Sequence, residues 1–174
     1  MNGNDEMSKA SGVSDTVICK YDESMHLDRL RECLVELQDF ERRLDPRMPP
    51  GCDIVDEYVP RMLDRCIECD GKVLIAEVDH EVAGFVTILT KVTSTELEDG
   101  DVEYGLVSDL MVRKSFRARG LGRKLLEEAE SFARANGVKW LRIGVLADNQ
   151  AADNLYSSMG FAGLYIEREK DLRT

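Results

Sequence analysis

The N-terminal third of the chain combines a short strand-like pattern with the spacing of amphipathic helices. Residues 16–21 are typical of a strand. Apolar residues then recur every three or four positions, which predicts a helix over residues 24–44 that ends before the helix-breaking pair Asp45-Pro46. A second helix is predicted over residues 53–69, with Pro60 either kinking it or starting its stronger half. The apolar stripe of the first helix is Leu27, Leu30, Leu34, Leu37 and Phe40.

Beyond the second helix the apolar pattern takes the period of strands. Enrichment in Val and Ile predicts strands at 73–78 and 82–90, which the turn at Asp79-His80 joins into a hairpin. The later elements are a polar, acidic loop at 93–101, a strand at 103–112, a helix from 121 to the cap Asn136-Gly137, a strand at 140–146, a short helix at 151–159 and a last strand at 161–168. The order β-α-α-β-β-β-α-β-α-β predicts an α/β (α+β) fold, with a central mixed sheet and helices on both faces.

Length and composition are those of an ordinary globular protein. The 174 residues, 43% hydrophobic and 33% charged, suit one domain with a sizeable core. We expect a disordered polar tail at Met1–Ser14, which lacks the apolar region of a secretory signal, and a single domain at 15–174. No apolar run reaches the length of a membrane-spanning helix, so no membrane partner is expected.

The net charge and the cysteine content indicate which classes of partner and which cell compartment are expected. The net charge of −11 argues against a nucleic-acid partner, because phosphate backbones need clustered cations. It suits a cationic substrate such as an amine, or serves solubility alone. Five cysteines without a signal peptide favour reduced thiols in a cytoplasmic protein. Cys66-x-x-Cys69 lacks a second pair at zinc-site spacing, and neither His26 nor His80 supplies one, so no metal is expected.

One glycine-rich loop carries a chemical signal. Arg117-Ala118-Arg119-Gly120-Leu121-Gly122 lies between a predicted strand and a predicted helix, where free N–H groups at the positive end of the helix dipole stabilise an anion. The glycines let phosphate oxygens approach the backbone, and Arg123 and Lys124 add positive charge. The loop is not a P-loop, which needs Gly-Lys-Ser/Thr, nor a dinucleotide fingerprint, which needs a small residue where Leu125 stands. We interpret it as a diphosphate site; a tight turn without a ligand is the alternative.

This loop and a second segment resemble the GNAT superfamily of N-acetyltransferases. The loop is similar to the family's coenzyme A pyrophosphate loop. Asn149-Gln150-Ala151-Ala152-Asp153-Asn154-Leu155-Tyr156, followed by Met159-Gly160-Phe161, matches the family's Asn-x-x-Ala-x-x-Leu-Tyr-x-x-x-Gly-Phe segment. The resemblance covers about Val17 to Glu169 and implies the GNAT acyl-CoA N-acyltransferase fold. It also implies direct transfer of the acetyl group of acetyl-CoA to a primary amine of a small molecule or protein. Many relatives in the family are dimers, so a homodimer is one expectation.

The same resemblance implies roles for particular residues. Leu110-Met111-Val112 corresponds to the strand segment whose backbone pairs with the pantetheine arm and polarises the thioester carbonyl. Tyr156 corresponds to the general acid that protonates the leaving thiolate; a half-buried structural tyrosine is the alternative. Asn149 is expected to contact the pantetheine amides, or only to cap a helix. The expected cofactor-binding residues are Leu110, Met111, Val112, Arg117, Ala118, Arg119, Gly120, Leu121, Gly122, Arg123, Asn149 and Tyr156.

The general base is a choice between two carboxylates, or is dispensable if the amine is already neutral. Some amine acetyltransferases of the family carry a Glu-Asp pair before this strand segment, and here Ser108 replaces the Glu. Asp109 and, earlier on the strand, Glu103 are the candidate bases, or are only solvated charges. Their even spacing predicts that both point to the face opposite Ser108.

The acceptor side is expected to be walled by the two N-terminal helices and the loop around residues 45–56. Asp53, Asp56 and Glu57 are candidates for attracting a cationic amine, or are only favourable charges at a helix N-terminus. The alternative to an enzyme is a catalytically silent module that binds acetyl-CoA or regulates a partner.

Overall fold

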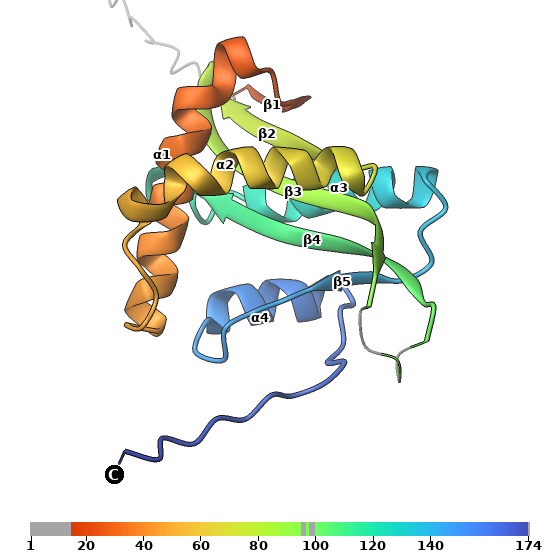
Figure 1. The fold of residues 1–174 in the computed structure, drawn as a ribbon. Helices are drawn as coiled ribbons and strands as arrows, with labels where there is room; N and C mark the ends of the chain where they lie inside the picture. The colour runs from red at the N-terminus through yellow and green to blue at the C-terminus, as the bar shows by residue number, and fades with distance from the viewer. Residues whose placement is uncertain (1–14, 95–96, 98–99, 174) are drawn as a thin grey trace, which may run out of the picture.

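A five-stranded mixed sheet forms the centre of the described chain, which in this computed structural model comprises residues 15–94, 97 and 100–173 (Figure 1). The strands are β1 (Thr16–Lys20), β2 (Lys72–Val78), β3 (Glu81–Thr93), β4 (Glu103–Val112) and β5 (Leu141–Ile143), and they lie in that order across the sheet. Neighbours are antiparallel except β4 and β5, which are parallel. The expected tail Met1–Ser14 and part of the acidic loop, residues 95–96 and 98–99, lie outside the described residues.

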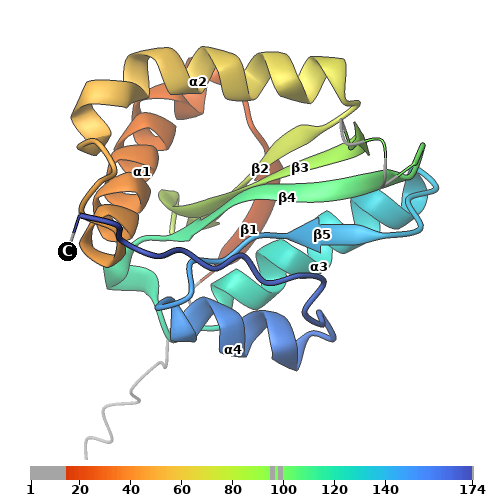
Figure 2. The same ribbon diagram turned by 60° about the horizontal axis from the view of Figure 1, so that its bottom comes forward.

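Helices cover both faces of the sheet, which confirms the predicted fold class (Figure 2). α1 (Glu23–Leu44) and α2 (Gly51–Glu68) pack on one face, and α3 (Leu121–Ala135) and α4 (Gln150–Ser158) pack on the other. A short 3-10 turn, η2 (Lys114–Phe116), precedes α3. Within the described residues, no helix has the length and apolar character needed to cross a membrane.

The two helical layers bury two apolar cores against the sheet. Leu30 and Phe85 are fully buried on the α1–α2 face, and Leu125 and Val86 are fully buried on the α3 face. Phe85 and Val86 are neighbours on β3, so their side chains point to opposite faces. Because both faces are covered, residues 82–90 of β3 are buried without interruption instead of alternating. This central strand holds β4 in place, and β4 carries the site described below.

Local sequence signals fix α1 and α2 as a pair. The carboxylate of Asp22 caps α1 by accepting the N–H of Ser24 at 2.9 Å. α2 begins at Gly51, earlier than predicted, and continues through Pro60. A Cβ at Gly51 would lie 2.6 Å from the carbonyl oxygen of Val35 on α1, so only glycine permits this close approach. The start of α2 is thereby held against the middle of α1.

β4 and β5 separate after a short parallel stretch. Gly105–Val107 pairs with Leu141–Ile143, and no further pairing joins the two strands in the described residues. The predicted strand at 140–146 is therefore shorter, and Trp140 is 66% exposed. The half of β4 from Ser108 to Val112 consequently has an open edge.

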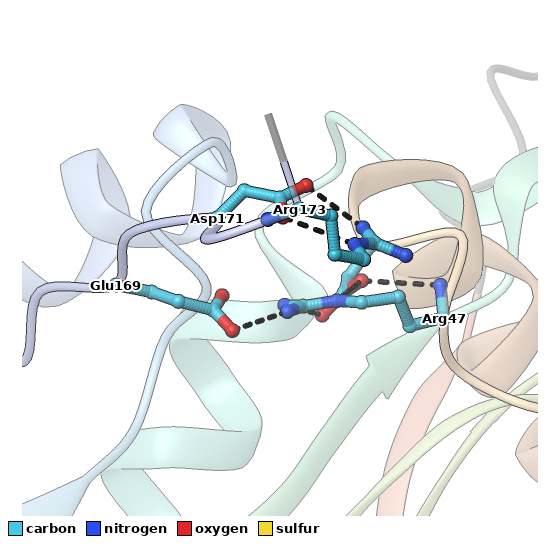
Figure 3. A network of polar contacts seen from close by, with 5 residues as sticks. Arg47, Glu169, Asp171 and Arg173 are labelled. Carbon is cyan, nitrogen blue, oxygen red and sulfur yellow. Dashed lines mark hydrogen bonds and ion pairs between the residues drawn. The ribbon is translucent and has the colours of Figure 1, made fainter.

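The last predicted strand, 161–168, does not form. Residues 161–173 have no regular structure, and Leu164, Tyr165 and Ile166 are 66%, 79% and 78% exposed. Strand-favouring side chains form a strand only where a partner edge supplies hydrogen bonds and packing, and the three-residue β5 offers little of either. The segment instead runs from α4 to the loop between α1 and α2, where Glu169 pairs with Arg47 at 2.5 Å (Figure 3).

Candidate active site

A cleft of about 690 Å³ opens where β4 and β5 diverge. Residues 107–112 of β4 line it, together with side chains of α1 and α2 from one side and of the glycine-rich loop and α4 from the other. The fold thus brings Asp109 of β4, Gly120 at the start of α3, and Asn149 and Tyr156 of α4 to one cavity.

Gly120 and Gly122 serve different purposes in the glycine-rich loop. Gly120 is the N-cap of α3 and has a φ of 78°, a left-handed conformation that disfavours other residues. A Cβ at Gly120 would meet no described atom within 4 Å, so a side chain there would project into open space. A Cβ at Gly122 would instead lie 3.2 Å from Cδ2 of Leu155. Gly122 therefore permits close packing of α3 on α4, while Gly120 leaves room for a ligand.

The loop presents a run of backbone N–H groups without acceptors. The first helical hydrogen bond of α3 runs from the N–H of Lys124 to the carbonyl oxygen of Gly120 at 3.1 Å. Among the described residues, the N–H groups of residues 118–123 find no acceptor. Such groups at a helix N-terminus carry partial positive charge, so this loop favours an anion.

The arginines of the loop differ in position. Arg117 donates from Nε to the carbonyl oxygen of Val112 at 2.8 Å, which ties the loop to the end of β4. Arg119, expected to bind the cofactor, lies outside the cleft with its guanidinium 5.4 Å from the centre of the Phe116 ring. Arg117 and Arg123 are the only cationic side chains among the described residues that line the cleft. The positive charge of the cleft is thus confined to its loop end.

Glu36 of α1 contacts the residues that lead into the loop. Its carboxylate accepts the N–H of Lys114 at 3.0 Å and lies 3.9 Å from the guanidinium groups of Arg113 and Arg117. This role could not be predicted from the sequence, because Glu36 lies far from the loop in the chain. It is a positioning residue, since it contacts the loop and does not line the cleft.

Leu110, Met111 and Val112 lie on the open half of β4. One edge of this segment pairs with β3, where Met111 lies opposite Phe85. The other edge has no partner strand in the described chain and faces the cleft. Backbone groups directed to that edge are available to an extended ligand, as they would be to a neighbouring strand.

α4 contributes Tyr156 and Asn149. Tyr156 is 9% exposed, and burial, reinforced by the negative charge of Glu41, raises its pKa to about 12. Its hydroxyl has no hydrogen-bond partner among the described residues, and its ring meets Phe161 edge-on at 6.1 Å. The side-chain oxygen of Asn149 accepts the N–H of Ala152 at 3.2 Å, so the helix-capping interpretation is confirmed. The amide nitrogen of Asn149 makes no contact of this kind in the described chain.

Asp109 is 6% exposed and is held by two hydroxyl groups. Tyr58 of α2 donates to its Oδ1 at 2.5 Å, and Ser108 donates to its Oδ2 at 2.7 Å. Desolvation and the charge of Asp109 raise the pKa of Tyr58, so this phenol remains a donor at neutral pH. Asp109 was a candidate from the sequence, but Tyr58 was not, because the spacing of residues in α2 does not show that Tyr58 contacts β4.

Glu103 lies outside the cleft, and the prediction that Glu103 and Asp109 point to the same face of the sheet is wrong. Thr87 lies opposite Asp109 and Ile88 opposite Val107, so Ser108 is an extra residue that forms a β-bulge. Val107 consequently packs in the α3 core, whereas Asp109 meets Tyr58 of α2 on the other face. Glu103 is exposed at the far end of β4 and does not line the cleft.

The acidic residues expected to attract the acceptor point elsewhere. Asp56 pairs with Arg31 and Glu57 pairs with Arg61 at the exposed surface. None of the three candidates, Asp53, Asp56 and Glu57, lines the cleft. Glu41 of α1, which the sequence analysis missed, does line it. A signal was present: Glu41 follows Leu34 by seven positions and Leu37 by four, so a charged residue occupies the apolar stripe of the helix.

Two groups of cysteines and their neighbours have the residue types of metal ligands. Cys19, His26 and Glu77 bring their ligand atoms within 4.8 Å of one another. The N–H of Asp22 donates to Nδ1 of His26 at 2.9 Å, so the neutral ring carries its proton on Nε2, which points at Glu77 at 3.4 Å. Nε2 therefore has no free lone pair for a metal ion. In the Cys66-x-x-Cys69 pair, burial and then the charge of Asp109 raise the pKa of Cys66 to about 11, which disfavours the thiolate that metals bind.

The sequence matches the model of the Acetyltransferase (GNAT) family over residues 35–161. A mycothiol acetyltransferase of Nocardiopsis dassonvillei is 32% identical over 108 residues, which are 62% of this chain and 32% of that protein. An uncharacterized N-acetyltransferase of Lactobacillus delbrueckii subsp. lactis is 37% identical over 84 residues, 48% of this chain and 47% of that one. The chain thus spans half or less of the length of these curated relatives.

Solved structures share the fold. An aminoglycoside N-acetyltransferase in complex with CoA superposes with a TM-score of 0.65 at 16% identity, covering 92% of this chain and 97% of that one. At 16% identity this likeness shows a shared arrangement of helices and strands and nothing more.

Proposed function

Because this chain belongs to the acetyltransferase (GNAT) family, we propose that it transfers the acetyl group of acetyl-CoA directly to a primary amine. One observation carries the proposal: a single cleft joins an anion-binding loop, an open strand edge and a buried Tyr156–Asp109 region. Those features supply, in that order, sites for a diphosphate, an extended arm and a reacting group.

The donor half of the cleft fits acetyl-CoA. The free N–H groups of residues 118–123 and the guanidinium groups of Arg117 and Arg123 would hold the diphosphate. The pantetheine arm would extend along the open edge of β4 from Val112 toward Leu110, and the amide nitrogen of Asn149 would donate to one of its carbonyls. The thioester then lies near Asp109 and Tyr156.

The reaction forms a C–N bond and breaks a C–S bond. The neutral amine attacks the thioester carbonyl, and a backbone N–H on the open edge of β4 stabilises the developing oxyanion. Asp109 receives the proton released by the amine, directly or through water. Glu103 has no part, since it lies outside the cleft.

Tyr156 acts on the leaving group. With a pKa of about 12 its phenol is protonated at neutral pH, and it donates a hydrogen bond to the departing sulfur. Full proton transfer to a free thiolate, whose conjugate acid has a pKa of about 8.5, would be uphill by roughly 5 kcal/mol. The hydrogen bond to sulfur in the transition state is therefore the main contribution of Tyr156.

The five cysteines are all free, which supports a reducing compartment such as the cytoplasm for the enzyme. We expect no nucleic-acid partner, since the net charge is −11.

The test measures thiol release when the protein is mixed with acetyl-CoA and a panel of primary amines, with the mass of the product determined. The expected result is thiol release that depends on one class of amine, with a gain of one acetyl group in the product. Tight binding of acetyl-CoA without release by any amine would instead support a silent binding module. Tighter binding of ATP than of coenzyme A would overturn the assignment of the loop.

A further inference from the structure

The acceptor end of the cleft combines apolar walls with two carboxylates. α1, α2 and the loop between them supply the apolar side chains, which are Leu34, Leu37, Met48, Ile54 and Val55. The charged groups that line this end are Glu41 and Asp109. The two cations of the cleft, Arg117 and Arg123, belong to the loop end and to the diphosphate.

Glu41 has no partner for its charge among the residues that the structure describes. Its side chain is partly buried, and no hydrogen bond or ion pair to it is found among the described residues. Burial, and then the negative charge of Asp109, raises the pKa of Glu41. Removing a carboxylate from water without a partner is unfavourable, so a cation bound beside Glu41 would relieve this cost.

Asp109 also lacks a cationic partner in the described chain, although its oxygens accept hydrogen bonds. Both oxygens accept hydrogen bonds from neutral hydroxyls, those of Tyr58 and Ser108, and neither oxygen meets a cation in the described chain. The charge of Asp109 contributes to raising the pKa of Glu41, and the charge of Glu41 contributes to raising the pKa of Tyr58 and of Tyr156. Arg65, on the exposed side of α2, is the cation whose charge reaches Tyr58. Glu41, Asp109 and Tyr156 all line the same cleft.

We propose that Glu41 and Asp109 together bind the ammonium group of a small primary amine whose remaining body is apolar. The proposal rests on the acetyl transfer proposed above and names its acceptor class. An ammonium group offers three N–H donors, which matches two carboxylates with unused lone pairs. The apolar walls accommodate a hydrocarbon chain or ring. The polar groups of Gln38, Tyr58 and Ser108 that also line the cleft already donate hydrogen bonds to Pro49 or Asp109, so they favour a hydrocarbon body over a polyhydroxylated one. After binding, Asp109 takes one proton from the ammonium and releases it to water. The neutral nitrogen attacks the thioester carbonyl, and Asp109 then takes the second proton from that nitrogen as the thiolate leaves.

The first experiment replaces Glu41 with its neutral isostere and measures steady-state kinetics with hexylamine and 2-phenylethylamine. Glu41→Gln is expected to raise the KM for the amine by about 30-fold or more, because an ammonium loses one of two desolvated carboxylates. The dissociation constant of acetyl-CoA, measured by calorimetry, is expected to stay within twofold. The matched control is Glu57→Gln, which makes the same charge change on the exposed side of α2 outside the cleft and should leave the KM within twofold.

A second measurement does not depend on turnover. N,N-dimethylhexylamine is a cation that cannot form a stable amide, and 1-hexanol has a similar chain without the charge. Calorimetry on the wild-type protein saturated with coenzyme A should show binding of the dimethylamine and little binding of the alcohol. In Glu41→Gln this preference should fall by at least about tenfold.

The outcomes separate this inference from the proposed function. If no amine is acetylated although acetyl-CoA binds, the proposed function fails. If hexylamine is acetylated but Glu41→Gln and Glu57→Gln give the same KM, the ammonium site is wrong while the transferase stands. If spermidine or glucosamine is acetylated with a higher kcat/KM than hexylamine and 2-phenylethylamine, the apolar part of the proposal is overturned.

Discussion

The most direct test of the anion site is a charge placed at Gly120. A side chain at this position projects into open space beside the free N–H groups of residues 118–123. Gly120→Glu would place a carboxylate about 5 Å from a bound diphosphate, a repulsion of about 3 kcal/mol per unit charge at an effective dielectric constant near 20. Gly120 is exposed, so solvent and salt reduce this effect. We expect coenzyme A to bind about 10- to 100-fold more weakly.

The matched control is Gly120→Gln, which has the same size and the same backbone strain. Either substitution forces a residue with a Cβ to adopt a φ of 78°, at a cost of roughly 1 kcal/mol. For a chain of this length that cost lowers Tm by about 2–4 °C in both variants. The difference in affinity between Glu and Gln therefore reports the charge alone, and it should shrink as salt is added.

Calorimetry with coenzyme A and with pantetheine separates the possible sites. Only coenzyme A carries the diphosphate, so pantetheine should bind both variants equally. Equal affinity of the two variants for coenzyme A at low salt would refute the placement of the diphosphate at this loop.

Three further changes test other parts of the structure. Tyr156→Phe should lower kcat by about 10- to 100-fold while the affinity for acetyl-CoA stays the same, and equal kcat in the two proteins would make Tyr156 structural. Because the pKa of Tyr156 is about 12, the wild-type rate should show no loss from ionisation of this phenol below about pH 10. Glu41→Gln should raise Tm at pH 7 in the absence of ligands, because the pKa of Glu41 is higher in the folded protein. The wild type is then penalised as pH rises from the unfolded pKa through the folded one, and the gain should vanish near pH 4; a gain that persists there contradicts the reasoning. Glu169→Gln should change Tm by less than about 2 °C, since its pair with Arg47 is exposed (Figure 3); a larger loss would show that the C-terminal segment stabilises the fold.

Elements with strong local patterns were predictable from the sequence. The predicted bounds of β4 coincide with the observed ones, and the hairpin of β2 and β3 turns at Asp79-His80 as expected. Both residues have positive φ values, as a tight turn between antiparallel strands requires. The predicted strand at 161–168 failed for the opposite reason, since its formation depends on a distant partner edge that the sequence does not reveal.

The cofactor end and the acceptor end of the site also differ in how far they could be predicted from the sequence. The glycine-rich loop and the segment from Asn149 to Tyr156 are each a continuous stretch of the chain. The residues of the loop therefore indicated a diphosphate site, and the resemblance of the second segment to the GNAT family implied a cofactor-facing helix. The acceptor end is assembled from α1, α2 and β4, and its geometry depends on a bulge at Ser108 that places Asp109 opposite Tyr58. A bulge changes which face a side chain takes without leaving a clear mark in the sequence.

Departures from locally favourable structure gather around this one cleft. Within the described residues, β4 leaves half of one edge unpaired, the N–H groups of residues 118–123 find no acceptor, and Glu41 interrupts an apolar stripe with an unpartnered charge. Each is unfavourable for an empty protein, and each is relieved by one part of the proposed substrates: the pantetheine arm, the diphosphate and the ammonium group. Such departures are expected at functional sites, where stability is given up for binding. Saturating coenzyme A together with N,N-dimethylhexylamine should therefore raise Tm more than coenzyme A alone, and Glu41→Gln should remove that added increase.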